Sequence, residues 1–175
     1  MKCRSILAAL LAAMMLGSCA SQSDVPTGMA RASDEIVDYD LFVPDEWVID
    51  QTGGAVSAYR SAKDPTSVSV MVWNLPYADN TLDDWWKSYQ DEFSLIFEEF
   101  TLLSEEDMIL DSVAARKYVY TGKIADNTYR YTQVAAIRRG SVYLMTFTEL
   151  ASQSEETAAK HAAEFAEILE FFRWR

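Results

Sequence analysis

The sequence has very little of the material from which most catalytic and metal sites are built. Among its 175 residues there is one histidine, His161, and there are two cysteines, Cys3 and Cys19. A metal site made of several histidines, or a relay of paired histidines, is therefore impossible. A Ser-His-Asp triad would have to use His161, and no G-x-S-x-G elbow is present to supply its serine.

Other signatures of chemistry are missing as well. Only 6 glycines occur, and none forms a phosphate-binding loop, so Gly53-Gly54 alone predicts a turn. The many carboxylates do not follow the spacing of a calcium loop. A pair of carboxylates for glycoside cleavage stays open, because the fold sets their separation. The sequence thus predicts no catalytic residue, no metal ligand and no cofactor, and it favours a protein that is not an enzyme.

Positive charge is scarce: the formal net charge is −12. Such a field repels phosphates, so we expect no nucleic-acid partner and no attraction to anionic lipid headgroups through the overall charge. A charge of this sign is also common in exported domains.

The N-terminus is typical of an exported chain. Lys2 and Arg4 precede an apolar run over residues 6–16, which is too short to span a bilayer as a helix. The run ends in Leu16-Gly17-Ser18-Cys19, which resembles the lipobox of bacterial lipoproteins. That resemblance implies that the Cys19 thiol receives a diacylglycerol and that the signal peptide is cut before it. The alternative is an ordinary signal peptide with a chance cysteine.

This motif sets the expected domain organisation. Residues 1–18 form the signal peptide, residues 19–36 carry the lipidated cysteine and a flexible tether, and residues 37–175 form a single domain. The protein is then held by its lipid on the extracytoplasmic face of the cell membrane, with the envelope layer left open. The mature chain keeps no free thiol and no disulfide.

The last third of the sequence predicts a hairpin followed by a helix. Residues 129–138 and 141–150 are dense in β-branched and aromatic side chains, and Arg139-Gly140 supplies the turn. The second strand is apolar on both faces, which is typical of a central strand. The S-x-x-E pattern from Ser152 to Glu155 predicts a helix start. An apolar stripe at helical spacing then follows, with its centre at Phe165 and Leu169: Ala158, Ala162, Phe165, Ala166, Leu169 and Phe172.

The middle of the sequence adds further strands and one helix. The capping pattern at Thr81 predicts a helix that runs to Phe100, between strands that end at Asn74 and begin at Thr101. If Asp111-Ser112 is a two-residue turn, Lys117 lies opposite Glu106. In the same way, the Arg139-Gly140 turn places Arg130 opposite Glu149. The pattern predicts an α+β fold with a mostly antiparallel sheet of about six strands, an N-terminal β-hairpin, one mid-chain helix and one C-terminal helix.

Aromatic side chains are the best candidates for a binding surface. Adjacent Trp85 and Trp86 lie on the apolar side of the mid-chain helix, so core packing is favoured over a sugar-stacking platform. Trp73 and Trp174 are surplus to the predicted core and are the candidate ligand or partner residues.

Three stretches together resemble the PsbP-like family. They are the opening YDLFVPDEW from Tyr39 to Trp47, the helix from Thr81 after a strand, and the end from Gly140 to Phe172. The family includes the PsbP subunit of photosystem II, a yeast factor acting on the GTPase Ran, and many bacterial lipoproteins. The resemblance implies an α/β/α sandwich. Family members with known roles bind or stabilise other proteins, and they share no catalytic set that could be transferred to this chain.

We therefore expect a membrane-anchored, non-catalytic binding or scaffold module for another envelope protein. The alternative is a small-ligand-binding lipoprotein with an aromatic-lined cleft. A deep apolar pocket with converging polar groups would favour the ligand, and an exposed apolar patch would favour the protein partner.

The lipobox gives the first testable prediction. The variant Cys19→Ala should lose both lipid labelling and cleavage before residue 19, because the acyl chains that hold the protein on the membrane are attached to that thiol. Labelled palmitate fed to cells that express either form measures this. Equal incorporation into the wild type and the variant would contradict the assignment.

Overall fold

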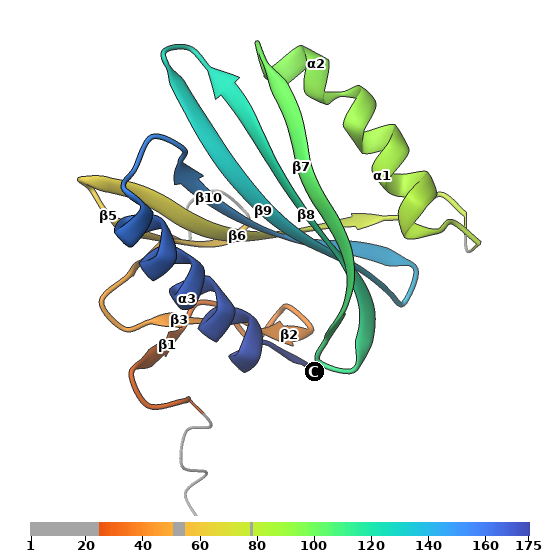
Figure 1. Cartoon of the computed structure of the whole chain (residues 1–175). Coiled ribbons are helices and arrows are strands. Elements are labelled where there is room, and N and C mark those ends of the chain that lie inside the picture. Colours follow the sequence, from red (N-terminus) through yellow and green to blue (C-terminus); the bar gives the residue numbers. More distant parts are fainter. Residues whose placement is uncertain (1–24, 51–54, 78) are drawn as a thin grey trace, which may run out of the picture.

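The computed structural model describes residues 25–50, 55–77 and 79–175, and a seven-stranded antiparallel sheet is its main element (Figure 1). Each neighbouring pair of strands in this sheet is antiparallel. Across the sheet, the strands are β4 (Val48–Asp50), β5 (Val56–Ser61), β6 (Asp64–Asn74), β10 (Ser141–Leu150), β9 (Asn127–Arg138), β8 (Val113–Ile124) and β7 (Phe100–Leu110). The expected N-terminal hairpin is β4–β5, and its predicted turn at Gly53-Gly54 lies outside the described residues.

Strand β10 is the centre of the sheet, as its two apolar faces predict. Met145 and Phe147 point into one core and Leu144 into the other. The first core is covered by α3 (Glu155–Phe171), and the second by α1 (Leu82–Asp91) and α2 (Phe93–Ile96). The α+β class and the helix layers on both faces are confirmed, but the sheet has seven strands rather than about six.

Two of the long hairpins, β7–β8 and β9–β10, have the predicted register. Glu106 pairs with Lys117, and Arg130 pairs with Glu149. The turn between β7 and β8 is Asp111-Ser112, with φ of 42° and 70°, a left-handed pair that matches the twist of the strands. The Lys117–Glu106 and Arg130–Glu149 ion pairs form across these ladders.

The mid-chain helix is shorter than predicted. Thr81 and Asp84 form the expected capping box, but α1 ends at Asp91 and α2 ends at Ile96, after which Phe97 is extended. The rings of Phe97 and Phe100 pack on Tyr120 of β8. This packing requires a glycine beneath it, because a Cβ at Gly122 would overlap the Phe97 ring. The two aromatic residues recur at helical spacing in the sequence, but their contacts with β8 favour an extended backbone instead.

The N-terminal segment belongs to the fold although it was expected to be a tether. Strand β1 (Met29–Arg31) pairs with β3 (Phe42–Pro44), and β2 (Tyr39–Asp40) pairs with β11 (Arg173–Trp174). Met29 and Ala32 are buried, and Val25 packs against the same core as α3. The fold therefore begins before the expected start at Val37. The backbone hydrogen bonds of β1 hold a stretch whose polar composition predicted flexibility.

Helix α3 is rolled relative to the predicted stripe. It is capped by Ser154 rather than Ser152, and it buries His161, Phe165 and Ile168. Leu169 is only half-buried, and two alanines of the expected stripe, Ala162 and Ala166, are exposed. Large apolar side chains gain more from burial than alanines do, which favours this roll. Among the described residues, no helix is long and apolar enough to cross a membrane.

This roll predicts a difference between adjacent residues. The variant Ile168→Ala should lower the free energy of unfolding by about 2–5 kcal/mol, since Ile168 is fully buried. Leu169→Ala should cost less than about 2 kcal/mol, because that side chain is already partly exposed and less apolar surface is lost from the core. Urea denaturation of both variants tests this. A larger loss for Leu169→Ala would contradict the observed orientation.

Candidate functional site

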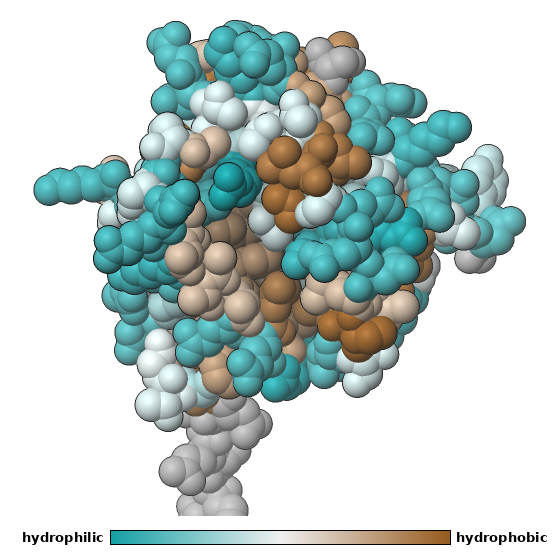
Figure 2. Space-filling model, viewed as in Figure 1, coloured by the Kyte–Doolittle hydropathy of each residue, from teal (hydrophilic) through white to brown (hydrophobic). Residues whose placement is uncertain are grey.

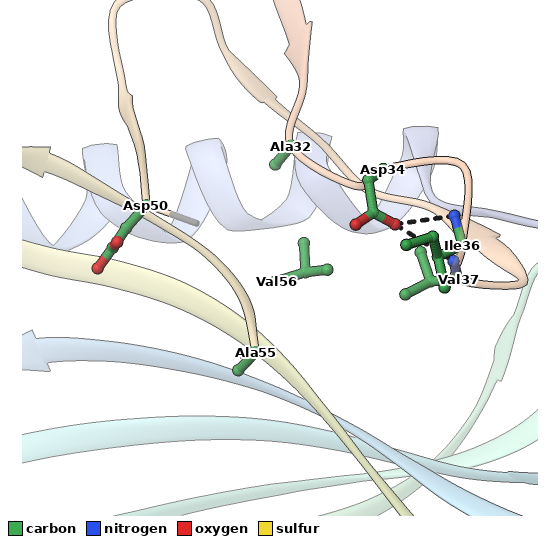
Figure 3. Close-up of a pocket in the computed structure, with 7 residues that line it drawn as sticks. All are labelled: Ala32, Asp34, Ile36, Val37, Asp50, Ala55 and Val56. Carbon is green, nitrogen blue, oxygen red and sulfur yellow. Dashed lines mark hydrogen bonds between the residues drawn. The ribbon is translucent and has the colours of Figure 1, made fainter. Parts of the chain in front are cut away.

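An apolar cleft lies between the N-terminal segment and the β5–β6 hairpin, and we call it the N-terminal cleft. It consists of two hollows of about 210 and 370 Å³ that share Val37, Ala55 and Val56. Figure 3 shows seven side chains around the first hollow. The residues that line the two hollows are Ala32, Asp34, Ile36, Val37, Tyr39, Asp50, Ala55, Val56, Val70, Met71 and Val72.

The segment that forms one wall is fixed by hydrogen bonds. One carboxylate oxygen of Asp34 accepts from the backbone N–H groups of Ile36 at 2.9 Å and Val37 at 3.3 Å (Figure 3). The Arg175 guanidinium donates to the carbonyl oxygens of Asp34 at 2.8 Å and Val37 at 3.1 Å. These bonds tie the wall to the end of the chain, so the cleft is preorganised.

The cleft exposes apolar side chains to solvent. Ile36 is 92% exposed at its margin, and Val72 is 44% exposed on β6. Met71, between Val70 and Val72, points to the opposite face of the sheet, because it pairs with Leu144 of the other core. Val56 and Val70, which pair across β5 and β6, continue the apolar surface inward. Contiguous exposed apolar side chains of this kind are typical of surfaces that bind other molecules.

Negative groups border the same surface. Asp34 and Asp50 line the first hollow, and Glu35 is exposed between Asp34 and Ile36. Tyr39 lines the second hollow; its burial, together with Asp34 and Asp38, raises its pKa, so the phenol stays neutral. The cleft therefore combines an apolar floor with an acidic rim.

A buried polar cluster around His161 lies elsewhere, beneath α3. His161 Nδ1 is 3.2 Å from a Glu149 oxygen and 3.3 Å from Thr66 Oγ1. Its Nε2 is 3.3 Å from Arg60 and 3.4 Å from Asp64. The cluster joins α3 to β5, β6 and β10, and His161 is 1% exposed. Both ring nitrogens lie within hydrogen-bond distance of other protein groups, so the cluster holds α3 in its orientation on the sheet.

The two tryptophans selected from the sequence do not come together. Trp73 packs beside Trp85 and Tyr89 in the α1 core. Trp174 packs against the other core, where its indole N–H donates to the Leu110 carbonyl and Arg138 lies over its ring. Of the adjacent pair, Trp86 is buried and stacks on Tyr118 at 3.7 Å. Both candidates thus make structural contacts, on opposite faces of the sheet.

Sequence reasoning missed the cleft because its wall lies in the expected tether. One signal was available: Asp34 two residues before Ile36 is the pattern of an Asx turn. Cys19, the predicted lipidation site, lies outside the described residues. Within the part of the chain that the structure describes, no group of three or more histidine, cysteine, aspartate or glutamate side chains could hold a metal ion.

Comparisons with known proteins find similarity in fold but not in sequence. No family model matches it, and no curated protein matches it significantly. The solution structure of cyanobacterial PsbP (CyanoP) from Synechocystis sp. PCC 6803 is similar at a TM-score of 0.62 and 18% identity, covering 91% of this chain and 99% of that one.

Two further solved structures are similar. The Saccharomyces cerevisiae Ran-binding protein Mog1p has a TM-score of 0.57 at 9% identity, covering 83% of this chain and 95% of that one. LpqN of Mycobacterium tuberculosis, described as involved in cell envelope biogenesis, has a TM-score of 0.55 at 14% identity, covering 77% and 82%. The expected resemblance to PsbP-like proteins is confirmed at the level of fold.

The polar cluster gives a prediction for acid stability. Burial alone would raise the pKa of Asp64, but hydrogen bonds from Thr66 and Arg60 outweigh it and lower the pKa to about 2, against 3.8 for a free side chain. Because the folded pKa is the lower one, the stabilisation is complete above about pH 4 and is lost as the pH falls toward 2. The variant Asp64→Asn should be less stable than the wild type by up to about 2 kcal/mol at pH 7.

The measurement is urea denaturation of both proteins from pH 7 to pH 2. The difference between them should shrink below pH 4, because the wild-type carboxylate becomes protonated. A difference that is constant with pH would show that Asp64 does not contribute through its charge.

Proposed function

We propose that this protein is an exported lipoprotein, anchored through Cys19, that acts as a non-catalytic docking module for another envelope protein. The N-terminal cleft is the docking surface. The single observation that carries the proposal is the pair of exposed apolar side chains at Ile36 and Val72 beside a preorganised apolar floor.

The chemistry of the cleft specifies the partner. Its apolar floor favours aliphatic or aromatic side chains, and its acidic rim at Asp34, Glu35 and Asp50 favours lysine or arginine beside them. A partner segment with an apolar core and basic flanks fits both. The formal net charge of −12 also speeds the encounter with a basic surface.

The position of the fold relative to the predicted anchor supports a partner at the membrane. Val25 already packs on the core, so five residues separate it from Cys19. Six fully extended residue steps reach at most about 20 Å. The cleft wall follows within a few residues of β1, so the docking surface is held close to the bilayer.

The solved structures of similar fold agree with this class of function. Mog1p is described as a Ran-binding protein, and LpqN as involved in cell envelope biogenesis. Protein binding and an envelope role therefore both occur on this fold.

Site-specific photo-crosslinking in the intact, lipidated protein tests the proposal. A photoreactive phenylalanine at position 72 should give a discrete adduct with one envelope protein, whereas the same probe at Ile109 should not. Ile109 is a matched control because it is 65% exposed and lies on β7, at the other end of the sheet.

Two substitutions then connect the adduct with the cleft. Ile36→Asp should abolish the adduct from position 72 and weaken binding of the purified partner at least about tenfold, since it places a charge on the apolar surface. Ile109→Asp should leave both unchanged. Identical adducts from positions 72 and 109, or binding that Ile36→Asp does not alter, would reject the cleft as the docking surface.

A further inference from the structure

The sheet carries another solvent-exposed surface, on the face that α1 and α2 cover in part. Met71 of β6 pairs with Leu144 of β10, and residues opposite each other in a ladder point to the same face. Leu144 is 1% exposed in the core beneath α1, whereas Met71 is 45% exposed. The cover of the helices therefore ends between these two residues, and the neighbouring part of the sheet is open to solvent.

Hydroxyl groups dominate this open part of the sheet, which we call the hydroxyl ledge. The register of β5, β6 and β10 places seven side chains on it: Ser57, Tyr59, Ser67, Ser69, Met71, Thr146 and Thr148. Each of them is half-buried or exposed. All except Met71 carry a hydroxyl, and none is charged, although 24% of the residues in the sequence are charged.

The absence of charge distinguishes the ledge from the rest of the surface. Lysine, arginine, glutamate and aspartate make up about 25–35% of a typical soluble surface. Figure 2 shows strongly hydrophilic residues over much of the face that it presents. The nearest carboxylate in the ladder is Asp50, which ends β4 and pairs with Ser57 at the outer margin. A ligand on the ledge therefore meets neutral donors and acceptors rather than ions.

Several of these hydroxyls keep their full hydrogen-bonding capacity. In the described part of the chain, the hydroxyls of Ser67, Ser69 and Thr148 have no protein partner. All three side chains are half-buried, so solvent reaches them and a ligand can reach them too. A hydroxyl both donates and accepts hydrogen bonds. The three groups together match a ligand that itself presents several hydroxyls.

Aromatic rings border the ledge. Trp73 lies on the same face of β6, and its ring centroid is 6.3 Å from that of Trp85 and 6.0 Å from that of Tyr89 on α1. At the β9 side, Tyr131 pairs with Thr148. These four rings are half-buried, and Trp and Tyr combine an apolar body with a polar tip. Hydroxyls beside aromatic surface suit a sugar, which has polar edges and apolar C–H faces.

We propose that the hydroxyl ledge binds a neutral oligosaccharide. The sugar hydroxyls exchange hydrogen bonds with Ser67, Ser69 and Thr148, and one sugar ring packs against the exposed part of Trp73. This site is separate from the N-terminal cleft, because Val72 of the cleft and Trp73 point to opposite faces of β6. The glycan and the protein partner thus bind on opposite faces of one sheet.

The chemistry and shape of the ledge disfavour other occupants. A charged ligand finds no opposite charge on it. A partner helix would bury the hydroxyls of Ser67 and Ser69 against apolar side chains without hydrogen bonds, which is costly. A second copy of the chain would meet α1 first, because α1 lies on the same face and a helix is about 10–12 Å across with its side chains. A chain of sugar rings is narrow enough to lie beside α1.

The test uses three neutral oligosaccharides: maltohexaose, cellopentaose and tetra-N-acetylchitotetraose. The protein is studied as isolated from cells, without sugar-headed detergents, and its NMR chemical shifts are the readout. At least one sugar should shift the amides of Ser67, Ser69 and Thr148 and the indole N–H of Trp73, and these shifts should saturate. A neutral peptide of alternating glycine and serine should leave them in place. No saturable shift with any of the sugars, or equal shifts with the peptide, would overturn the proposal.

Matched variants locate the site. Ser69→Arg should abolish the sugar shifts, because it places a long charged side chain on the ledge. Ser104→Arg, an exposed position on β7 at the other end of the sheet, should bind like the wild type. Thr148→Val removes one hydroxyl with little change of shape and should weaken binding about fivefold. Ile36→Asp, in the cleft, should leave sugar binding unchanged, so this test is independent of the docking surface.

Thermal melts of each variant confirm folding. If Ser69→Arg is folded and still binds the sugar, or if Ser104→Arg loses binding to the same extent, the ligand does not lie on the ledge.

Discussion

The structure depends on the burial of β10 from both sides. Met145 and Phe147 need one apolar layer and Leu144 needs another, so the sheet must be covered on both faces. Strands β6 and β9 pair with its two edges, which places residues 141–148 of the central strand in a ladder on both sides. The three layers of the fold follow from this one strand, because no two-layer arrangement would keep both of its faces out of water.

Position and orientation of α3 have different causes. The hairpin that precedes it delivers the helix to the sheet, and apolar burial of Phe165 and Ile168 holds it there. Its rotation about its own axis is fixed in addition by His161, whose ring is surrounded by Glu149, Thr66, Arg60 and Asp64. A buried polar group leaves few acceptable orientations, because any other roll would separate it from its partners.

The sequence was sufficient for local and repetitive features. The hairpin registers followed from turn length and from the facing charges at Glu106–Lys117 and Arg130–Glu149, and the cap at Thr81 located α1. Features that depend on distant partners were not predictable. Phe97 leaves its helix for Tyr120, α3 turns toward the residues around His161, and the polar stretch before Val37 is ordered by β3. The residue pattern of each segment alone does not show these partners, and the N-terminal cleft was missed because its wall lies in the polar stretch expected to be a tether.

The N-terminal cleft borders the core that α3 covers. Tyr39 and Val70 of the cleft belong to the apolar cluster beneath α3, together with Phe147 and Phe165. This side of the sheet is covered by one helix and by short N-terminal strands (Figure 1). The cleft lies beside those short strands. The cleft is thus a margin that the short strands leave uncovered, and the packed core beneath it fixes its floor.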